Sequence, residues 1–384
     1  MNVAFVTHAY PRWDGDLAGA FIERLVLALA ERGHAVRVIA PADAGKGGRE
    51  LRHRVPVTRV RYAPGRWETL AYRGTMVEAA RSPLGLAAVA SLVARQARAI
   101  TRSCLDQRID LVHAHWWVPG GVSAWLARQR YVVTLHGTDV TLLERSAPAR
   151  LMARWVLRGA AVVTAVSTYL AERAARVTGI DARRIVVQPM PADHRAFTRT
   201  SAGGGGVVTV GRLTKQKRIN VILEALAWLR AEGRTLPLTV VGDGPERAAL
   251  EQTARELGLE SHTRFAGAVA PERVPELVGD ADVFAFPAVG EGLGLAAVEA
   301  LLLGIPVVAA TDGGGVTDVV PPTGAGRLVP PNDVAALARA IDELARDPES
   351  RRRAAEAGGA LRHRVEPAAV AERFEAVYRQ ALDA

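Results

Sequence analysis

Two carboxylates lie eight positions apart in a glycine-rich segment, PAVGEGLGLAAVE, in the second half of the chain. Glu291 stands in a loop after an apolar run, and Glu299 falls inside the helix predicted from about Leu295. Gly292 and Gly294 allow the backbone to approach a ligand closely, and the first amides of a helix favour an anion. Because carboxylates accept hydrogen bonds from hydroxyls, one glutamate could bind a sugar and the other a ribose.

A second candidate group, GRLTKQK, follows the apolar run 207–210 and places Arg212 and Lys217 five residues apart. Two cations on a strand-to-helix loop match the charge of a diphosphate, and fixed cations stabilise the negative charge that builds up as a diphosphate leaves. Such a loop on its own is more often a solvated basic turn. The two glutamates elsewhere in the second half of the chain favour the diphosphate-binding interpretation here.

Histidines end or follow three apolar runs in the first half of the chain. His136 opens the tetrapeptide HGTD, which ends at Asp139, directly after one run. His113 and His115 end a second run, and His8 follows the first. For His136 the position at a strand end favours contact with a substrate, whereas ring stacking or core hydrogen bonding explains the others as well as a function does.

The tripeptide DAD, Asp280 to Asp282, has the spacing of a metal-binding Asp-x-Asp sequence. It precedes the apolar run that begins at Val283, which puts it at the amino-terminal end of a strand. Ligands of open α/β sheets bind at the opposite end, so a structural role is expected. No other group has the spacing of a metal site, and no metal cofactor is expected.

The composition is that of a folded, water-soluble protein, with 384 residues, 49% of them hydrophobic and 23% charged. This length predicts two domains of roughly 150–200 residues each. The single cysteine, Cys104, indicates a reducing compartment. The amino terminus does not resemble a signal peptide, and no apolar run reaches the ~20 residues of a membrane span. A cytoplasmic protein is expected.

The net charge of +9 favours anionic partners. Basic residues outnumber acidic ones in the segment 46–81, which is either a solvated surface or a contact for an anionic membrane or a charged acceptor. Aromatic residues make up only 5% of the chain and do not interleave with the basic ones, so nucleic acid is not expected as a partner.

Short apolar runs alternate with stretches of helical period, which is typical of parallel strands joined by crossover helices. The predicted fold class is therefore α/β, with strands over 3–7, 35–40, 110–114, 131–135, 161–166 and 184–188, and then over 207–210, 238–242, 263–267, 282–286 and 306–310.

Prolines and four consecutive glycines separate these two sets of strands. They predict a first domain over 1–190, a linker over 191–206 and a second domain over 207–366. The last helix, 367–384, has an apolar stripe that needs a surface, and it is expected to join the first domain. Two doubly wound domains that face each other would share a cleft at the carboxyl ends of their strands.

These motifs, in this order, resemble the retaining glycosyltransferases of family 4. The most specific match is EGLGLAAVE, followed by ALLLGIPVVAA and the glycines 313–315; HGTD, GRLTKQK and GDGP at 242–245 are further matches. The resemblance covers nearly the whole chain. It implies the GT-B fold, two facing Rossmann-like domains with a cleft between them. It also implies transfer of a sugar from a UDP- or GDP-sugar to a hydroxyl acceptor without a metal.

The resemblance further implies roles for the charged side chains of the second domain. Arg212 and Lys217 bind the diphosphate of the donor. Glu299 binds the ribose hydroxyls, and Glu291 binds the transferred sugar at the reacting centre.

Other implied roles belong to backbone amides and to the first domain. The amides of Gly294 and Leu295 contact the sugar or the phosphate, and Gly19 approaches the phosphates from the first domain. His136 lies near the reacting centre. Three further residues are expected on the acceptor side: His8, His115 and Asp139.

Two segments depart from the family pattern. Met190 and Pro191 replace the usual Asn-Gly or Met-Gly step, and Asp318 replaces a glutamate after the glycine run. A nucleotide-sugar epimerase, a sugar phosphorylase and a non-catalytic nucleotide-sugar-binding protein are the alternative functions on this fold. The acceptor is left open among a small molecule, a glycan and a lipid-linked sugar.

Overall fold

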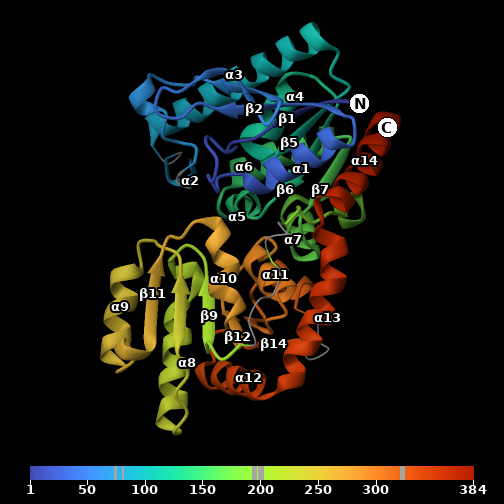
Figure 1. Cartoon of the computed structure of the whole chain (residues 1–384). Helices are drawn as coiled ribbons and strands as arrows, with labels where there is room; N and C mark the ends of the chain where they lie inside the picture. The colour runs from blue at the N-terminus through green and yellow to red at the C-terminus, as the bar shows by residue number, and fades with distance from the viewer. Residues whose placement is uncertain (73–75, 80–81, 193–196, 198–202, 321–324) are drawn as a thin grey trace. The chain divides into compact units, whose positions relative to one another are not determined.

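The computed structural model describes residues 1–72, 76–79, 82–192, 197, 203–320 and 325–384. The chain divides into two compact units. Figure 1 shows the chain coloured by residue number, from blue at the amino terminus to red at the carboxyl terminus. The first unit comprises Met1–Pro191 together with Pro367–Ala384, and the second comprises Ala192–Glu366. Most of the predicted linker, 193–196 and 198–202, lies outside the described residues, and Gly203–Gly206 belong to the second unit.

The first unit is built on an eight-stranded sheet with the order β3-β4-β2-β1-β5-β6-β7-β8. All neighbouring strands are parallel except β3 and β4, which form an antiparallel pair at one edge. The strands are β1 (Asn2–Val6), β2 (Ala35–Pro41), β3 (Gly48–Arg52), β4 (Val55–Val60), β5 (Leu111–His115), β6 (Tyr131–Leu135), β7 (Val162–Ala165) and β8 (Ile185–Val187).

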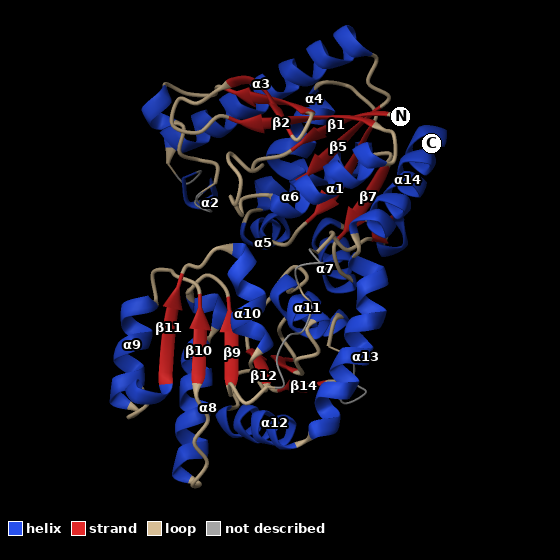
Figure 2. Ribbon diagram, viewed as in Figure 1, coloured by secondary structure: helices blue, strands red, loops and turns tan. Residues whose placement is uncertain are grey.

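Helices cover both faces of this sheet, as Figure 2 shows, so β5 and β6 are buried along their whole length. This burial explains their continuous apolar sequence. The helices of the first unit are α1 (Ala20–Glu31), α2 (Met76–Ala79), α3 (Pro83–Gln107), α4 (Val122–Leu126), α5 (Thr138–Arg145), α6 (Ala147–Gly159), α7 (Thr168–Thr178) and α14 (Pro367–Asp383).

The second unit has a six-stranded parallel sheet with the order β11-β10-β9-β12-β13-β14. Its strands are β9 (Val207–Val210), β10 (Leu238–Val241), β11 (Thr263–Gly267), β12 (Val283–Phe286), β13 (Val307–Ala310) and β14 (Gly326–Val329). Its helices are α8 (Ile219–Ala231), α9 (Arg247–Glu256), α10 (Val274–Gly279), α11 (Leu295–Leu302), α12 (Val334–Arg346) and α13 (Pro348–Val365).

Every strand predicted from the sequence is present, with ends that agree within one residue. The strands β3, β4 and β14 were not predicted. β3 is exposed and carries the polar sequence GRELR, so it lacks the apolar signal of a buried strand. β14 is only four residues long.

The basic segment 46–81 is partly used inside the first unit. Arg59 is buried and binds Glu50 and the carbonyls of Tyr10 and Pro11. Arg61 pairs with the fully buried Glu68 at 2.7 Å. These arginines act as structural cations rather than as a free basic surface, which favours the solvated or structural interpretation for this part of the segment.

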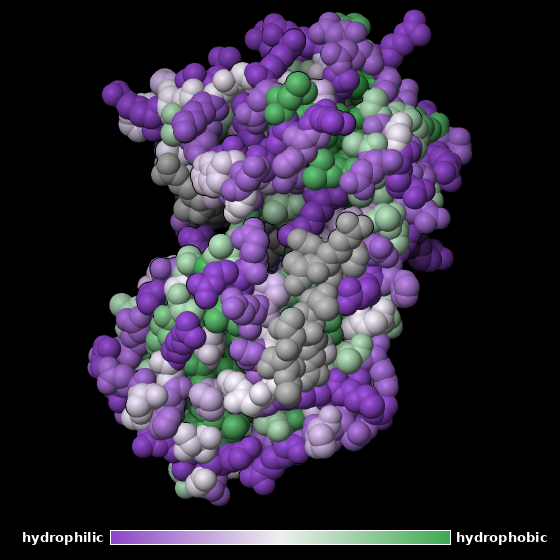
Figure 3. Space-filling view, in the orientation of Figure 1, coloured by the Kyte–Doolittle hydropathy of each residue, from purple (hydrophilic) through white to green (hydrophobic). Residues whose placement is uncertain are grey.

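No helix among the described residues has both the length and the apolar character to cross a membrane. In Figure 3, hydrophilic side chains cover most of the visible face of each unit, with apolar ones in small groups. Larger exposed apolar side chains include Leu84 at the start of α3 and Trp155 on α6, which are 80% and 63% exposed.

The last helix, α14, packs on α1 of the first unit and buries Phe374 and Tyr378 completely. Glu375 on the same helix is nearly buried and pairs with two residues that follow α1. Its Oε1 lies 2.5 Å from Arg32 Nε and 2.9 Å from His34 Nε2. The hydrogen bond from Arg32 lowers the pKa of Glu375 to about 2.

Replacing Glu375 by Gln removes the charge that Arg32 contacts and is expected to lower the free energy of unfolding by about 2 kcal/mol near neutral pH. The pKa of Glu375 falls from 4.5 to about 2 on folding, so this stabilisation is complete above pH 4.5 and is lost as the pH falls toward 2. Urea unfolding at a series of pH values tests this, and the difference between Glu375→Gln and the unsubstituted protein should shrink below pH 4.5.

Glu372→Gln, exposed on the same helix, is the matched control and should change stability little. Equal destabilisation by both substitutions would contradict the assigned role of Glu375.

Candidate functional site

The carboxyl ends of the strands in the second unit are joined by loops whose backbones touch. The amide of Leu213 donates to the carbonyl of Asp243 at 3.0 Å. A Cβ atom at Gly242 would lie 2.0 Å from the Gly211 oxygen, and one at Gly244 would lie 2.4 Å from the Leu213 oxygen. Only glycine therefore allows the loops after β9 and β10 to pack in this way.

Glu291 is held through its backbone by the loop that follows β13. Its amide donates to the Gly313 carbonyl at 2.9 Å, and its carbonyl accepts from the Gly315 amide at 2.8 Å. Gly314 lies between these bonds with a φ of 78°, and a Cβ atom there would sit 2.4 Å from the Glu291 oxygen. The glycine run after β13 thus positions Glu291.

The Glu291 side chain meets the loop after β9. Its Oε1 lies 3.0 Å from Lys217 Nζ and accepts a hydrogen bond from Gln216 Nε2 at 3.2 Å. The side chains of Lys217 and Glu291 are each 19% exposed, and Lys217 Nζ also lies 4.8 Å from the centre of the Phe286 ring. The structure therefore brings together two of the predicted residues as a half-buried pair, open to a polar ligand.

An ion pair between two loops of the second unit was not predicted from the sequence. Arg218 forms a two-pronged contact with Asp312, with N···O distances of 2.8 and 2.7 Å. Arg218 has a φ of 49° and precedes α8, and Asp312 precedes the glycine run. Since a bidentate guanidinium–carboxylate pair fixes both orientation and distance, it holds the Lys217 loop against the loop after β13, whose backbone in turn holds Glu291.

The other predicted donor-side residues lie on the same two loops or on α11. Arg212 is exposed in the loop after β9. Gly294, in the left-handed conformation with a φ of 80°, precedes α11, whose first residue is Leu295. Glu299 is half-buried in the second turn of α11. The start of α11 carries no acidic side chain, so its free amides retain their preference for an anion.

In the first unit, His136 follows β6 in a tight turn that Asp139 stabilises. The Asp139 Oδ1 atom accepts hydrogen bonds from the amides of His136, Gly137 and Val140 at 3.2, 2.8 and 3.0 Å. Among the described residues, its buried Oδ2 atom has no partner. Burial raises the pKa of Asp139 to about 6, against the lowering effect of these amides. Asp139 therefore shapes the turn that presents His136.

His136 is hydrogen-bonded to His115 from the adjacent strand, with a distance of 2.9 Å between His136 Nε2 and His115 Nδ1. Trp116 packs on this pair, and its ring centre lies 4.3 Å from that of His136 and 3.8 Å from that of His8. His8, His115 and His136 thus form one aromatic cluster at the carboxyl ends of β1, β5 and β6. His8 and His136 are half-buried, whereas His115 is fully buried.

His113 belongs to the core rather than to this surface. It is fully buried and contacts Tyr378 of α14 at 2.8 Å and Thr134 at 2.7 Å. The tyrosine comes from the far end of the chain, so this contact joins α14 to the centre of the sheet. The sequence left a structural and a functional interpretation open for His113, and the geometry favours the structural one.

All four of these histidines are neutral at neutral pH because burial disfavours the imidazolium form. Burial lowers the pKa of His8 to about 4 and that of His113 to about 3. The pKa values of His115 and His136 also lie well below 6.5, through burial and through neighbouring histidines. A neutral ring both donates and accepts one hydrogen bond, which suits contact with hydroxyl groups.

Gly19 precedes α1 and packs against the loop after β1. Its φ is 81°, and a Cβ atom would lie 2.4 Å from the Ala9 oxygen. The backbone geometry therefore requires glycine at this position for internal reasons alone, whatever contact it makes with a ligand.

Asp282 lies at the amino-terminal end of β12, where it accepts hydrogen bonds from the amides of Gly204 and Gly206 at 2.9 and 3.0 Å and pairs with Arg351. These contacts give it the structural role that the sequence indicated. Within the described part of the chain, no cluster of three histidine, cysteine or acidic side chains has the geometry to hold a metal.

Comparisons with known proteins identify the family. Residues 18–191 match the family model described as a glycosyl transferase 4-like domain, and residues 194–360 match glycosyl transferases group 1. A 2-deoxystreptamine glucosyltransferase of Streptomyces kanamyceticus is 32% identical over 267 aligned residues, and the match covers 62% of this chain and 69% of that protein. The chain belongs to the group 1 glycosyltransferase family.

Other relatives act on different substrates. A D-inositol 3-phosphate glycosyltransferase of Nocardia farcinica is 33% identical over 64% of this chain and 60% of its own. A GDP-mannose-dependent phosphatidylinositol monomannoside mannosyltransferase of Mycolicibacterium smegmatis is 34% identical over 61% of this chain and 65% of its own. The matched region thus spans less than two thirds of these two glycosyltransferases, and their substrates differ.

Solved structures confirm the predicted GT-B fold. Sucrose-phosphate synthase from Thermosynechococcus elongatus superimposes with a TM-score of 0.82 at 21% identity, over 100% of both chains. Anabaena HepE in complex with UDP-glucose superimposes with a TM-score of 0.74 at 22% identity, over 99% of both chains.

Lys217→Ala is expected to lower kcat/KM for this glycosyltransferase at least tenfold, or about 1.4 kcal/mol, because the lysine is held by Glu291 at the edge where an anion would bind. Steady-state kinetics with varied donor measures this effect. Lys215→Ala is the matched control, since Lys215 lies in the same loop but is exposed. Equal losses in the two variants would remove Lys217 from the site.

The histidine pKa values predict an NMR result. The Cε1–H signals of His8 and His113 should not shift between about pH 8 and pH 6, because burial lowers the pKa values of these rings to about 4 and about 3. The unfolded chain binds protons below pH 6.5 that the folded chain does not, so stability should fall as the pH drops below this value. A transition of either ring near pH 6.5 would contradict these lowered pKa values.

Proposed function

We propose that this protein transfers a sugar from a nucleotide diphosphate sugar to a hydroxyl of an acceptor, with retention of the anomeric configuration. The observation that carries the proposal is the half-buried pair of Lys217 and Glu291, fixed by backbone bonds at the carboxyl edge of the second sheet. Structures of Anabaena HepE with UDP and with UDP-glucose support a nucleotide sugar as the donor. The GDP-mannose-dependent relative keeps a GDP-sugar as the other candidate.

The second unit supplies the donor contacts in this proposal. Lys217 and Arg212 bind the diphosphate, and the amides of Gly294 and Leu295 at the start of α11 add to the positive field. As the bond between sugar and diphosphate breaks, negative charge grows on the leaving oxygen, and these fixed groups stabilise it more than they stabilise the bound donor. The contact of Lys217 with Glu291 keeps the ammonium group in place before the donor arrives.

Glu291 and Glu299 bind hydroxyl groups. Glu291 Oε1 already contacts Lys217 and Gln216, which leaves its other carboxylate oxygen to accept hydrogen bonds from the transferred sugar. Glu299 lies one turn further along α11 than the amides that face the phosphates and binds the ribose. This assignment follows the family resemblance, and the half-buried positions of both glutamates support it.

The first unit supplies the acceptor contacts in this proposal. His136, neutral and held by His115 and Asp139, accepts a hydrogen bond from a hydroxyl near the reacting centre. His8 and Trp116 extend this surface and suit a polyol or sugar, since aromatic rings pack on the C–H face of such ligands and histidines bind their hydroxyls. A small molecule, a glycan and a lipid-linked acceptor all present such groups.

A lipid-linked acceptor would require a peripheral membrane contact of a cytoplasmic enzyme. The exposed Leu84 and Leu86 at the start of α3 support such a contact, because they are 80% and 59% exposed. Arg59 and Arg61 pair with glutamates, so these two residues of the basic segment 46–81 contribute little to a membrane contact.

The donor and the need for a metal are tested together. A thermal-shift screen of UDP-, GDP- and ADP-sugars should find one donor family that stabilises the protein, and product analysis with that donor should show a new glycoside of retained configuration. Turnover should persist in EDTA, because Lys217, Arg212 and the start of α11 provide the positive charge.

Activity that vanishes in EDTA and returns with magnesium or manganese would refute metal independence. Conversion of the donor alone into an epimer would instead indicate the epimerase function, and binding without any product would indicate a non-catalytic protein.

A further inference from the structure

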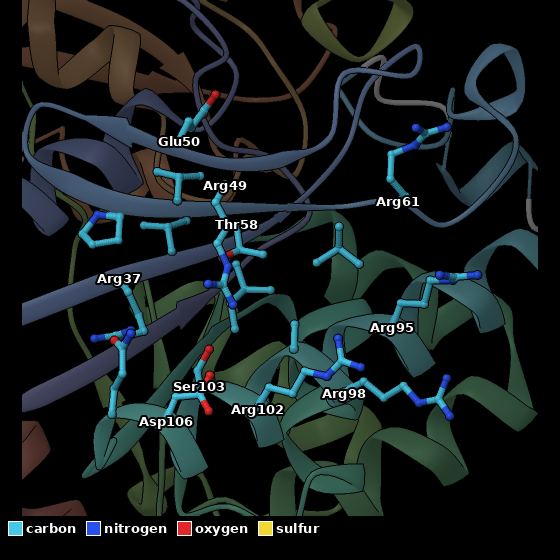
Figure 4. A pocket seen from close by; sticks show the side chains of 17 residues that line it. Arg37, Arg49, Glu50, Thr58, Arg61, Arg95, Arg98, Arg102, Ser103 and Asp106 are labelled. Carbon is cyan, nitrogen blue, oxygen red and sulfur yellow. The ribbon is translucent and has the colours of Figure 1, made fainter.

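An arginine-lined pocket of about 340 Å³ lies in the first unit, away from the histidine cluster. Its walls come from the strands β2, β3 and β4 on one side and from α3 on the other (Figure 4). The helix α3 turns its buried Gln96 toward the end of β1, where Gln96 Nε2 donates to the Thr7 carbonyl at 2.9 Å. The pocket lies on a different side of the helix and is not part of the surface around His136.

Three arginines of α3 form one stripe along the pocket. Arg95, Arg98 and Arg102 are three and four residues apart, a spacing that places them on the same face of a helix. Arg49 of β3 reaches toward this face from the opposite wall, as Figure 4 shows. Arg37 of β2 completes the set of five arginines on which the inference rests.

The acidic side chains at the pocket do not balance these charges. Glu50 points away from these arginines (Figure 4) and contacts Arg59 at 2.8 Å, and Arg61 pairs with Glu68. Among the described residues of the lining, Asp106 is the remaining carboxylate. For the five arginines, the described residues provide no carboxylate within ion-pair distance.

Arg37 has a buried donor atom, Nε, that has no hydrogen-bond partner among the residues that the structure describes. Burial also lowers the pKa of Arg37. A buried guanidinium donor without an acceptor is costly, and neighbouring arginines repel one another, so an anion in the pocket would relieve both costs.

The chemistry of the lining defines the ligand. A guanidinium group binds phosphate oxygens in a two-pronged manner, and five of them exceed the charge of a single phosphate. Among the described residues, no aromatic side chain lines the pocket for a base to stack on, and the volume suits a small molecule rather than a polymer. We propose that this pocket binds a ligand with two or more phosphoryl groups, independently of the donor site in the second unit.

Inorganic pyrophosphate is the first probe, titrated by calorimetry at low salt. The proposed donor site would also bind pyrophosphate, so the measurements use an Arg212→Ala/Lys217→Ala background, in which the pocket should still bind. There, Arg98→Gln/Arg102→Gln should weaken binding at least tenfold. Asp106→Asn should strengthen it, because it removes the carboxylate that faces the anion.

Arg145→Gln/Arg158→Gln is the matched control, because it removes two exposed helical arginines of the same unit outside the pocket. It should change affinity less than twofold. Absence of binding in the background, or equal weakening by the pocket and control variants, would overturn the proposal. Failure of the donor-site proposal would appear differently, as unchanged sugar transfer in Lys217→Ala.

Vesicle sedimentation separates a free phosphate ligand from a lipid headgroup. Vesicles that contain phosphatidylinositol phosphate are compared with vesicles of phosphatidylcholine alone. If the pocket takes headgroups, Arg98→Gln/Arg102→Gln should reduce sedimentation with the phosphoinositide vesicles, whereas the control variant should not. If the pocket takes soluble phosphates, the pocket variant should lose pyrophosphate binding and sediment like the control.

Discussion

The two backbone hydrogen bonds that join Glu291 to the glycine loop after β13 determine the geometry of the second unit's site. They fix the residue that carries the carboxylate, so its side chain meets Lys217 from the loop after β9 at 3.0 Å. The bidentate pair of Arg218 and Asp312 ties the loop after β9 to the loop after β13, whose backbone holds Glu291. Because the backbones are in contact, a side chain at Gly314 would push Glu291 away.

The two units use the same arrangement for different chemistry. In each, parallel strands end at one edge of a sheet, and the side chains that follow them meet there. The second unit gathers a lysine, glutamates and a helix start, which suit a charged donor. The first unit gathers neutral histidines and a tryptophan, which suit hydroxyl groups. Burial keeps the histidines neutral, and this neutrality separates the two environments.

The sequence alone was enough to predict the buried strands and to name candidate site residues in the loops that follow them. A strand buried on both faces is a continuous apolar run, so β5, β6, β9 and β12 could be recognised locally. β3 could not, because it is a polar edge strand whose pairing with β4 depends on the rest of the sheet. The pairing of His115 with His136 follows from the adjacency of β5 and β6, which the sequence does not reveal.

Contacts between distant segments were likewise beyond local reasoning. Arg218 and Asp312 are 94 residues apart, and His113 and Tyr378 are 265 apart. Nothing near either residue of a pair indicates its partner. The arginine pocket arises in the same way, since its charges come from α3, β2 and β3, whose packing depends on the fold. The sequence shows the excess of basic residues in 46–81, but it does not show that Arg49 of this segment meets the arginines of α3.

The most direct test of the central claim compares the binding of a nucleoside diphosphate and the corresponding monophosphate, using the base found in the donor screen. If Lys217 binds the second phosphate, the unsubstituted protein should prefer the diphosphate at least tenfold, and Lys217→Ala should lose most of this preference while Lys215→Ala retains it. An equal preference in all three proteins would show that the pair of Lys217 and Glu291 does not hold the diphosphate.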